Sequence, residues 1–523
     1  MPPKRDLFLL AIATFLLHAI CLTQYGWFRD ELYYVACSEH LDWGYVDHAP
    51  MVALVGWIAR HLFGESLFAI RVFPALAGGG IVLITGLLAR RLGAERFGQN
   101  LAALCAMIAP IYLGVGHFLS MNVFEPLFWM SMVYVAVVIF EGGDERLWLV
   151  FGAIAGLGLQ NKHSTLFFGS AFVLAMLLTP QRRHFARPWI WLGGVLAALI
   201  FLPNLIWEVR HDFATLELLT NVAHSNKNTA NTPLSFFAGQ VLLMHPLTLP
   251  IWLIGVVWLM WGGFSNPPLA GQIPPVAGEI PPLAGQRTRA TFRVLGLAFV
   301  ILFIEFVVMK GKIYYLSPAY PMLFAGGAIA IERKMPRQAR AIVVALLVIG
   351  GALLAPLAMP ILPVETYIAY QRTLHLEPPK TENHRMGPLP QQYADMFGWP
   401  EMTAAVARAY ATLTPEEKAK CAIFGQNYGQ AGAIDHFGPA YGLPKAISGH
   451  QNYFLWGPRG ATGDVLIVLD DDRETLLELF EDVQPAGDFS HPYSMPYEHW
   501  TIHICRKPKV PMAELWPKVK KWL

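Results

Sequence analysis

The sequence is long, apolar and weakly charged. It has 523 residues, of which 54% are hydrophobic and 15% are charged, and its formal net charge is +2. Because soluble globular proteins carry about a quarter charged residues, this composition predicts many segments that face lipid. The small net charge argues against a nucleic-acid partner, and the five cysteines lack the paired spacing of zinc modules.

Apolar runs predict the membrane helices. The first run, residues 7–22, follows Lys4 and Arg5 as in a signal peptide, but no small-residue cleavage site comes after it, so we expect a retained helix. A membrane helix needs roughly 20 apolar residues. On this basis eleven spans are predicted, at residues 7–27, 68–89, 98–117, 122–140, 147–161, 164–179, 188–206, 236–261, 294–310, 313–331 and 341–362.

The basic residues predict the orientation of these spans. Arginine and lysine gather in alternate connections, for example at 90–96, 182–187, 287–293 and 333–340. Such connections face the cytoplasm in multi-pass proteins. We therefore expect a protein of the cytoplasmic (inner) membrane with a cytoplasmic N-terminus and an extracytoplasmic C-terminal domain. An even number of spans would reverse the second assignment.

The chain is predicted to have two domains, a transmembrane domain at 1–363 and an extracytoplasmic α/β domain at 364–523. The first contains an external loop at 28–66 and a cytoplasmic proline-rich linker at 262–293. Within that linker, residues 266–287 repeat a seven-residue motif with paired prolines, which prevents helix formation. We interpret the repeat as an extended linker; the alternative is a ligand for a proline-recognition domain.

The C-terminal domain carries the signals of a soluble α/β fold. Thr414–Glu417 has the pattern of a capping box, and residues 465–469 form an apolar run that predicts a buried strand. Asp470–Asp472 follow that strand, and we expect them to cap the helix at 474–480 rather than to bind a metal. Cys421 and Cys505 lie beside strand-like runs, and a disulfide is predicted if those strands are neighbours.

The first external loop is the most informative segment for chemistry. Asp30 and Glu31 follow the first membrane helix directly, beside Tyr33 and Tyr34, and residues 44–50 continue the loop with Asp47 and His48. A carboxylate at a partly apolar boundary can act as a general base near neutral pH. The alternative is that the acidic pair only caps a helix end at the membrane interface.

This loop resembles the first loop of family 39 membrane glycosyltransferases, the relatives of dolichyl-phosphate-mannose protein mannosyltransferases and lipid A aminoarabinose transferases. The motif departs from the bacterial pattern only at Ala49, where a second proline is usual. Other matching motifs follow in order at 71–74, 158–162, 203–207, 311–316 and 426–433. The resemblance implies an α-helical polytopic membrane protein of the GT-C type with an additional C-terminal domain.

The resemblance also implies an activity. Such enzymes take a sugar from a polyprenyl-phosphate carrier and invert its anomeric centre. The family's catalytic acid maps onto Asp30, which would accept the proton of the attacking hydroxyl, and Glu31 matches the second acid of the pair. The acceptor stays open between an envelope lipid, a glycan and a protein hydroxyl. No cofactor is assigned, and a divalent metal stays open because Asp47 and His48 are too few ligands to define its site.

Polar residues beside the spans are the remaining candidates for substrate binding. Glu125 lies at the outer end of a predicted helix, where an unpaired carboxylate is costly. A departing lipid phosphate requires cations, and Arg71, Lys162, Lys310 and Lys312 fall on the outer side. The family's phosphate-contacting arginine lies near the position of Arg71. Snorkelling to the interface is the alternative for these cations, and an aromatic belt is the alternative for the sugar-contacting candidates Tyr314 and Tyr315.

Two other functions stay open at this point. A secondary transporter would use Asp30, Glu125 and Lys162 as an ion relay, although the sequence shows no internal duplication of the kind that transporters carry. A non-catalytic scaffold would use the external domain to bind envelope polymers.

Overall fold

The computed structural model describes residues 4–225, 231–261, 289–377 and 382–523. These residues form two compact units. Unit 1 comprises Met1–Leu22, Arg71–Ile206 and Ala230–Ile361, and unit 2 comprises Thr23–Ile70, Trp207–Thr229 and Leu362–Leu523. The repeat at 266–287 lies outside the described residues.

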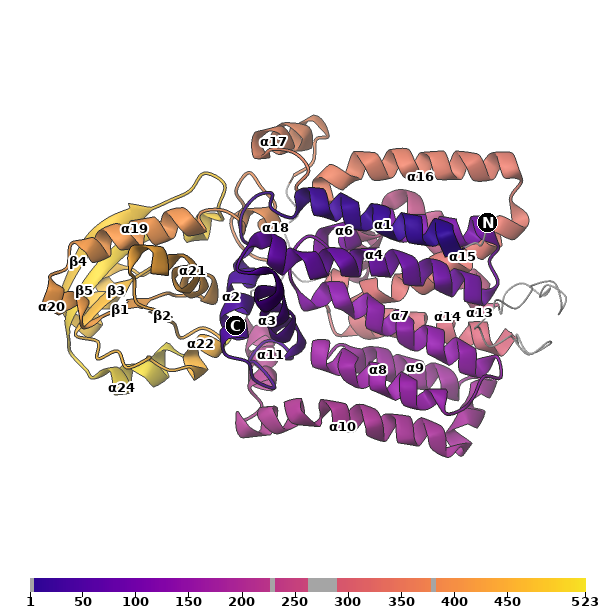
Figure 1. Ribbon diagram of the computed structural model, residues 1–523, viewed down its shortest axis with the longest axis horizontal. Coiled ribbons are helices and arrows are strands. Elements are labelled where there is room, and N and C mark those ends of the chain that lie inside the picture. The colour runs from indigo at the N-terminus through magenta and orange to yellow at the C-terminus, as the bar shows by residue number, and fades with distance from the viewer. Residues whose placement is uncertain (1–3, 226–230, 262–288, 378–381) are drawn as a thin grey trace. The chain divides into compact units, whose positions relative to one another are not determined.

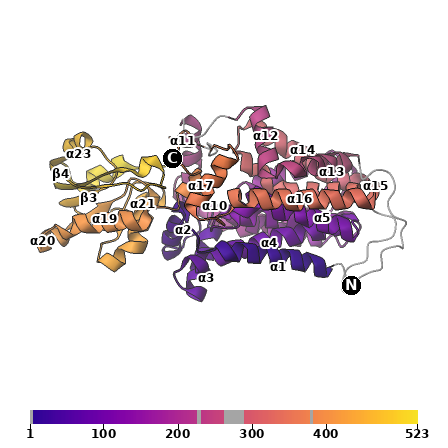
Figure 2. The same cartoon turned by 90° about the horizontal axis from the view of Figure 1, so that it is seen from above.

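Unit 1 is entirely helical and contains long helices that run side by side (Figures 1 and 2). Its helices are α1 (Lys4–Cys21), α4 (Leu67–Leu92), α5 (Arg96–Ile108), α6 (Pro110–Val115), α7 (Met121–Phe140), α8 (Leu147–Asn161), α9 (Thr165–Leu177), η1 (Pro180–Ala186), α10 (Pro188–Arg210), α12 (Pro233–Leu243), η2 (Pro246–Thr248), α13 (Leu249–Met260), α14 (Arg289–Val308), η3 (Ile313–Ala319), α15 (Tyr320–Lys334) and α16 (Arg337–Ala358). Each of the eleven predicted spans coincides with one to three successive helices.

Length and apolar composition separate the longest helices from the rest. Within the described ranges, α4, α7, α10 and α16 are long and apolar enough to cross a membrane, and α12 with its continuation to Met260 makes a fifth span if that bent pair counts as one. The structure thus confirms a polytopic helical protein. The total of eleven spans stays a prediction.

Prolines explain where two predicted spans are broken. The span at 98–117 is divided between α5 and α6, where Ala109 adopts an extended conformation before Pro110. The span at 236–261 bends by 99° between α12 and α13, at Pro246. Proline disfavours a helical residue before it and lacks the amide hydrogen that a continuous helix needs, so both breaks follow from the sequence.

Unit 2 contains the α/β domain and the helices of the first loop. Its elements are α2 (Arg29–Glu39), α3 (Met51–Phe63), α11 (Ala214–His224), α17 (Val364–Thr373), α18 (Gln391–Ala394), α19 (Trp399–Ala411), α20 (Pro415–Lys418), β1 (Cys421–Phe424), α21 (Tyr428–Phe437), η4 (Gly438–Tyr441), β2 (Ala446–Ile447), α22 (Asn452–Leu455), β3 (Val465–Val468), α23 (Arg473–Leu479), β4 (Phe480–Phe489), η5 (Pro496–Glu498), β5 (Trp500–Pro508), α24 (Met512–Leu515) and η6 (Trp516–Val519). The predicted small α/β domain is therefore confirmed.

The sheet of unit 2 has the strand order β2-β1-β3-β5-β4. Strands β2, β1 and β3 are parallel, whereas β5 is antiparallel to both of its neighbours. One face, with Leu466 and Cys505, packs against Leu476 of α23 and Met512 of α24. Helix α19 contacts the sheet through β3, β4 and β5 (Figure 1). Helix α21 leads from β1 toward β2, so its N-terminus lies at the carboxyl edge of the parallel strands, a common position for binding sites.

The predicted disulfide between Cys421 and Cys505 is wrong. Both cysteines are free and buried, because β3 lies between β1 and β5 and separates the two strands. The strand register also separates the two side chains. Cys421 aligns with Val465 of β3, whereas Cys505 aligns with the next residue of β3, Leu466. Successive residues of a strand point to opposite faces, so the two sulfurs lie on different faces of the sheet.

The local capping signals hold in the structure. Thr414 accepts a hydrogen bond from the backbone N–H of Glu417, and the carboxylate of Glu417 accepts one from the backbone N–H of Thr414, which is the predicted capping box. Asp472 caps α23 by accepting from the backbone N–H of Thr475 at 2.8 Å. Asp470 and Asp471 do not cap that helix; they bond instead to Gln430 and Gln426.

Candidate active site

Glu31 organises the start of α2, the helix that opens the first loop. The predicted loop at 28–66 contains α2 and α3. The first backbone amide groups of a helix have no acceptor within the helix, so those of α2 need acceptors from other groups. The buried carboxylate of Glu31 accepts a hydrogen bond from the backbone N–H of Phe28 at 3.0 Å. Glu31 thus fixes the first turn of α2, on which Asp30 lies.

The two carboxylate oxygens of Asp30 have different surroundings. Its Oδ1 accepts a hydrogen bond from the hydroxyl of Tyr428 at 2.8 Å and lies 3.7 Å from Nε of Arg29. Across the described ranges of the chain, its Oδ2 has no hydrogen-bonding or ion-pair partner, and 28% of the side chain is exposed. Burial raises the pKa of Tyr428, so its hydroxyl stays protonated and donates to Asp30. The carboxylate is therefore oriented while one oxygen is available to a substrate.

Arg29 connects the first loop to two residues far along the chain. Its Nη1 donates to the hydroxyl of Tyr497 at 2.8 Å, its Nη2 lies 3.8 Å from Oδ2 of Asp395, and its guanidinium lies 5.5 Å from the ring centre of Tyr428. Tyr497 in turn donates to Oδ1 of Asp395 at 3.0 Å. Burial raises the pKa of Asp395 to about 6, although Arg29 opposes that rise.

Asp47 and His48 contact the aromatic side chains of the first loop. The hydroxyl of Tyr33 donates to Oδ1 of Asp47 at 2.9 Å, and the ring of Tyr33 stacks on Tyr428 at 4.6 Å between centroids. Burial raises the pKa of Asp47, and the charge of Asp30 adds to the effect. His48 is buried, with Nδ1 2.9 Å from the carbonyl oxygen of Ala49. These contacts connect both residues to the surroundings of Asp30, and their predicted role in substrate binding stays a prediction.

The described part of the chain offers no cluster of three or more His, Cys, Asp or Glu side chains arranged to hold a metal ion. Asp47 and His48 are neighbours, but Nε2 of His48 lies 3.7 Å from the sulfur of Cys37, and Oδ1 of Asp47 is bonded to Tyr33. We therefore assign no metal to these two residues.

A second polar cluster lies in unit 1, between the start of α7 and the end of α8. Nζ of Lys162 lies 3.0 Å from Oε2 of Glu125 and 2.9 Å from Oδ1 of Asn122. Ser164 donates to the other oxygen of Glu125. Glu125 is almost fully buried, whereas 13% of the Lys162 side chain is exposed. The sequence singled out both residues but did not predict that they form an ion pair.

Two tyrosines complete this cluster. Nζ of Lys162 lies 4.7 Å from the ring centre of Tyr315 and 5.4 Å from that of Tyr314, distances at which a cation interacts with an aromatic face. Both tyrosines lie on η3, directly after Lys312, which is partly exposed. Glu125, Lys162, Tyr314 and Tyr315 are thus brought together from three separate motifs.

Arg71 is fully buried in α4. Its Nη1 donates to the carbonyl oxygen of Leu22 at 3.0 Å and lies 3.3 Å from Nε2 of His117. A side chain without exposed surface does not reach a phosphate in this conformation, so contact would require α4 or its neighbours to move. The role of Arg71 as a phosphate ligand stays a prediction.

We expect Arg71→Ala to destabilise the protein. The substitution leaves the Leu22 carbonyl and His117 without this partner, and each unsatisfied buried group costs about 1–3 kcal/mol. Thermal unfolding in detergent should show a lower melting temperature than for wild type. Arg210→Ala, at an exposed position, is the control and should melt like wild type. An unchanged melting temperature for Arg71→Ala would contradict a structural role.

Comparison with known proteins supports the resemblance found in the sequence. Residues 47–207 match the family model described as dolichyl-phosphate-mannose-protein mannosyltransferase. Lipid A galacturonosyltransferase RgtD of Rhizobium johnstonii is 30% identical over 228 residues, 42% of this chain and 47% of that protein. The undecaprenyl phosphate-alpha-4-amino-4-deoxy-L-arabinose arabinosyl transferase of Pseudomonas aeruginosa is 28% identical over 228 residues, 38% of this chain and 40% of that protein. The resemblance is confirmed, although the chain spans less than half the length of these curated relatives.

The solved structures decide the fold. The crystal structure of ArnT from Cupriavidus metallidurans bound to undecaprenyl phosphate has a TM-score of 0.60 with this chain, over 95% of this chain and 97% of that one, at 14% identity. The chain has the GT-C fold. At this identity the likeness establishes the fold alone, and it confirms the fold class that the first-loop motif implied.

The GT-C fold and the family match cover different parts of the candidate site. The family match includes Asp47, Arg71, Glu125 and Lys162, but it begins after Asp30. The fold likeness extends over 95% of the chain and so reaches into the C-terminal domain. Sequence reasoning missed Tyr428 as a site residue, although it lies in the matching motif at 426–433. Nothing in the sequence pointed to Asp395 or Tyr497.

Proposed function

We propose that this protein is an inverting glycosyltransferase that moves a sugar from a polyprenyl-phosphate carrier to a hydroxyl of an envelope lipid, glycan or protein at the outer face of the cytoplasmic membrane. The observation that carries the proposal is the hydrogen bonding of the Asp30 carboxylate. Tyr428 orients this carboxylate through Oδ1, and Oδ2 is left for an acceptor. The GT-C fold and the curated relatives, whose names specify a galacturonosyl and an aminoarabinosyl transfer, support it.

The chemistry follows from a single displacement. Oδ2 of Asp30 accepts the proton of the acceptor hydroxyl while that oxygen bonds to the anomeric carbon of the sugar. The bond between this carbon and the phosphate oxygen breaks, and the polyprenyl phosphate leaves with the electron pair. Attack from the face opposite the leaving group inverts the anomeric centre. General-base assistance of this kind contributes about 10²–10⁴-fold to a rate.

The leaving phosphate needs a cation. Among the predicted cations, Lys162 fits best, because its side chain is 13% exposed and its ammonium group is oriented by Glu125 and Asn122. Tyr314 and Tyr315 beside it offer faces for the sugar or the prenyl chain, and Lys312 precedes them. In the proposed mechanism Lys162 neutralises the charge that grows on the phosphate as the sugar bond breaks.

The domains and topology are part of the proposal. We propose a transmembrane catalytic domain at 1–363 and an extracytoplasmic domain at 364–523. A periplasmic phosphatase reporter fused after Leu523 should therefore be active in whole cells, because the eleven predicted spans and the arginine distribution favour an outer position for this end. A reporter that functions only in the cytoplasm should be inactive at the same position. The opposite pattern would show that a span was miscounted.

The direct test of the activity uses purified protein in liposomes. The donors are undecaprenyl phosphates carrying galacturonic acid or 4-amino-4-deoxy-L-arabinose, and the acceptor is an extract of envelope lipids and glycans. We expect release of undecaprenyl phosphate and a gain of one sugar mass in an acceptor. Mass spectrometry of envelopes with and without the gene should show the same mass difference. No difference in cells and no transfer from either donor would refute the proposal for these sugars.

A further inference from the structure

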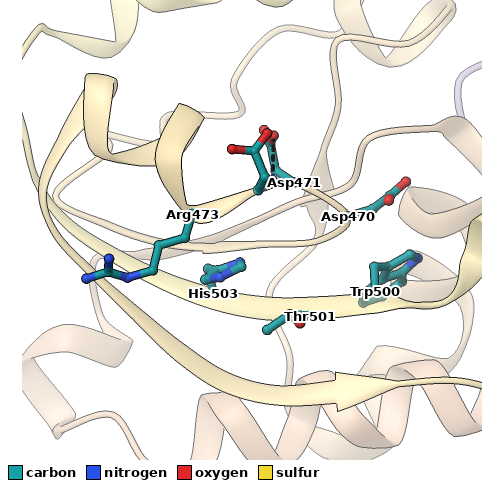
Figure 3. Close-up of a pocket in the computed structure, with 7 residues that line it drawn as sticks. Asp470, Asp471, Arg473, Trp500, Thr501 and His503 are labelled. Atoms are coloured by element: carbon teal, nitrogen blue, oxygen red, sulfur yellow. Dashed lines mark hydrogen bonds between the residues drawn. The ribbon is translucent and has the colours of Figure 1, made fainter.

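The α/β domain contains an open pocket that the proposed reaction does not use. Its volume is about 530 Å³, within the range of small-molecule sites, and it lies at the carboxyl end of β3 beside the first half of β5. Figure 3 shows two acids above the pocket, an imidazole between an arginine and an indole, and a threonine below. The lining residues are Asp470, Asp471, Asp472, Arg473, Trp500, Thr501 and His503.

The lining of this pocket includes a buried imidazole with an unsatisfied nitrogen. His503 is only 5% exposed, and within the described chain its Nδ1 is buried without a hydrogen-bonding partner. A buried polar atom without a partner costs free energy, which a bound ligand would recover. Burial lowers the pKa of His503, so the imidazole is neutral and carries one hydrogen-bond donor and one acceptor.

Asp470 adds a second energetically unfavourable feature to the same pocket. Its backbone adopts the left-handed conformation, with φ of 55°, which is uncommon for a residue other than glycine. Burial raises its pKa to about 7, and the nearby Glu498 adds to the rise. Strained backbone and a perturbed carboxyl beside an unpaired imidazole are typical of binding sites.

Two elements, α21 and η5, link the pocket to the surroundings of Asp30. Helix α21 begins with Tyr428, which bonds Asp30, and its Gln430 donates to Oε2 of Glu498 at 2.8 Å. Glu498 also accepts from the indole N–H of Trp500, at the pocket, at 3.3 Å. The turn η5 carries both Glu498 and Tyr497, the partner of Arg29. The pocket and Asp30 are therefore connected through α21 and η5.

We propose that this pocket binds a neutral or amino-bearing sugar ring of the acceptor. The exposed part of Trp500 offers an aromatic face for the C–H groups of a sugar, and Asp470, Asp471 and the imidazole of His503 accept or donate hydrogen bonds to its hydroxyl groups. The pocket lining contains three acids and one arginine, so its charge disfavours the binding of anionic sugars. The proposal that the pocket binds a sugar ring depends only on the pocket itself. The proposal that this ring belongs to the acceptor rests on the proposed glycosyl transfer.

The binding test uses the full-length protein in detergent and saturation-transfer NMR of three probes. The probes are glucose, glucosamine and glucuronate, which share a ring and differ in charge. We expect signals from glucose and glucosamine and a several-fold weaker signal from glucuronate. Trp500→Ala and the nearly isosteric Asp471→Asn should each reduce the first two signals at least about fivefold. The controls are Tyr441→Ala, an exposed aromatic residue outside the pocket, and Asp464→Asn, a surface acid.

The outcomes separate this proposal from the proposed function. Loss of signal in Asp471→Asn with an unchanged melting temperature supports the sugar site, whether or not transfer is detected. No signal from any probe with wild type, or equal signals in Asp471→Asn and Asp464→Asn, overturns it. Where transfer is detected, Asp471→Asn should raise the KM for the acceptor at least about fivefold and leave kcat and the KM for the donor near wild type. An equal loss in kcat would assign the residue to the reaction instead.

Discussion

Replacing Asp30 with asparagine is expected to reduce sugar transfer at least about a hundredfold while the protein stays folded. Asparagine keeps the shape and the contact with Tyr428 but cannot accept the proton of the acceptor hydroxyl. Single-turnover rates of purified wild type and Asp30→Asn, with saturating donor, measure the effect. Melting temperatures measured in parallel show whether folding is intact.

Asp464→Asn provides the matched control for this prediction. Asp464 is about half exposed and pairs with Lys420 at the surface, so its substitution should leave the turnover rate unchanged. If Asp30→Asn transferred sugar at a rate near that of Asp464→Asn, Asp30 would not be the base. Two other acids of the first-loop motif, Glu31 and Asp47, would then need the same test, although both accept internal hydrogen bonds.

The second large effect is expected at Lys162. Lys162→Met removes the cation that we propose neutralises the leaving phosphate, and we expect turnover to fall at least about a hundredfold. The substitution also leaves Glu125 buried without its ion-pair partner, which costs about 3–5 kcal/mol when one partner of a buried pair is removed. The single variant therefore confounds a loss of chemistry with a loss of stability.

The double variant Lys162→Met with Glu125→Gln separates these two causes. Glutamine removes the buried charge, so the melting temperature should recover most of the loss seen in Lys162→Met. Turnover should stay low, because the cation that we propose for the phosphate is still missing. Recovery of both stability and turnover would show that the ion pair only supports the fold and that the phosphate must be neutralised elsewhere, at Lys312 or Arg71.

The sequence predicts the membrane part well because lipid burial requires long apolar runs. Every predicted span coincides with helical structure, and the proline positions at 110 and 246 account for the two breaks. The strand at 465–468 and the cap at Asp472 were also predicted, since both depend on residues that are close in sequence. The disulfide prediction failed because strand order depends on contacts that no local pattern encodes.

The same distinction applies to the candidate site. Asp30, Glu31, Asp47 and His48 share a short motif, so the sequence alone suggests that they act together. Tyr428 lies 398 positions from Asp30, and Tyr497 lies 468 positions from Arg29, so only the folded chain shows that they meet. The ion pair between Glu125 and Lys162 also joins separate helices.

The anomeric configuration of the product tests the central claim most directly. Purified protein is supplied with an undecaprenyl-phosphate sugar of defined anomer, and the linkage in the product is determined by NMR. A single displacement assisted by Asp30 predicts that the product carries the opposite configuration to the donor. Retention would contradict the account, because it requires a covalent or otherwise two-step path in which Asp30 does not serve as the base for direct attack.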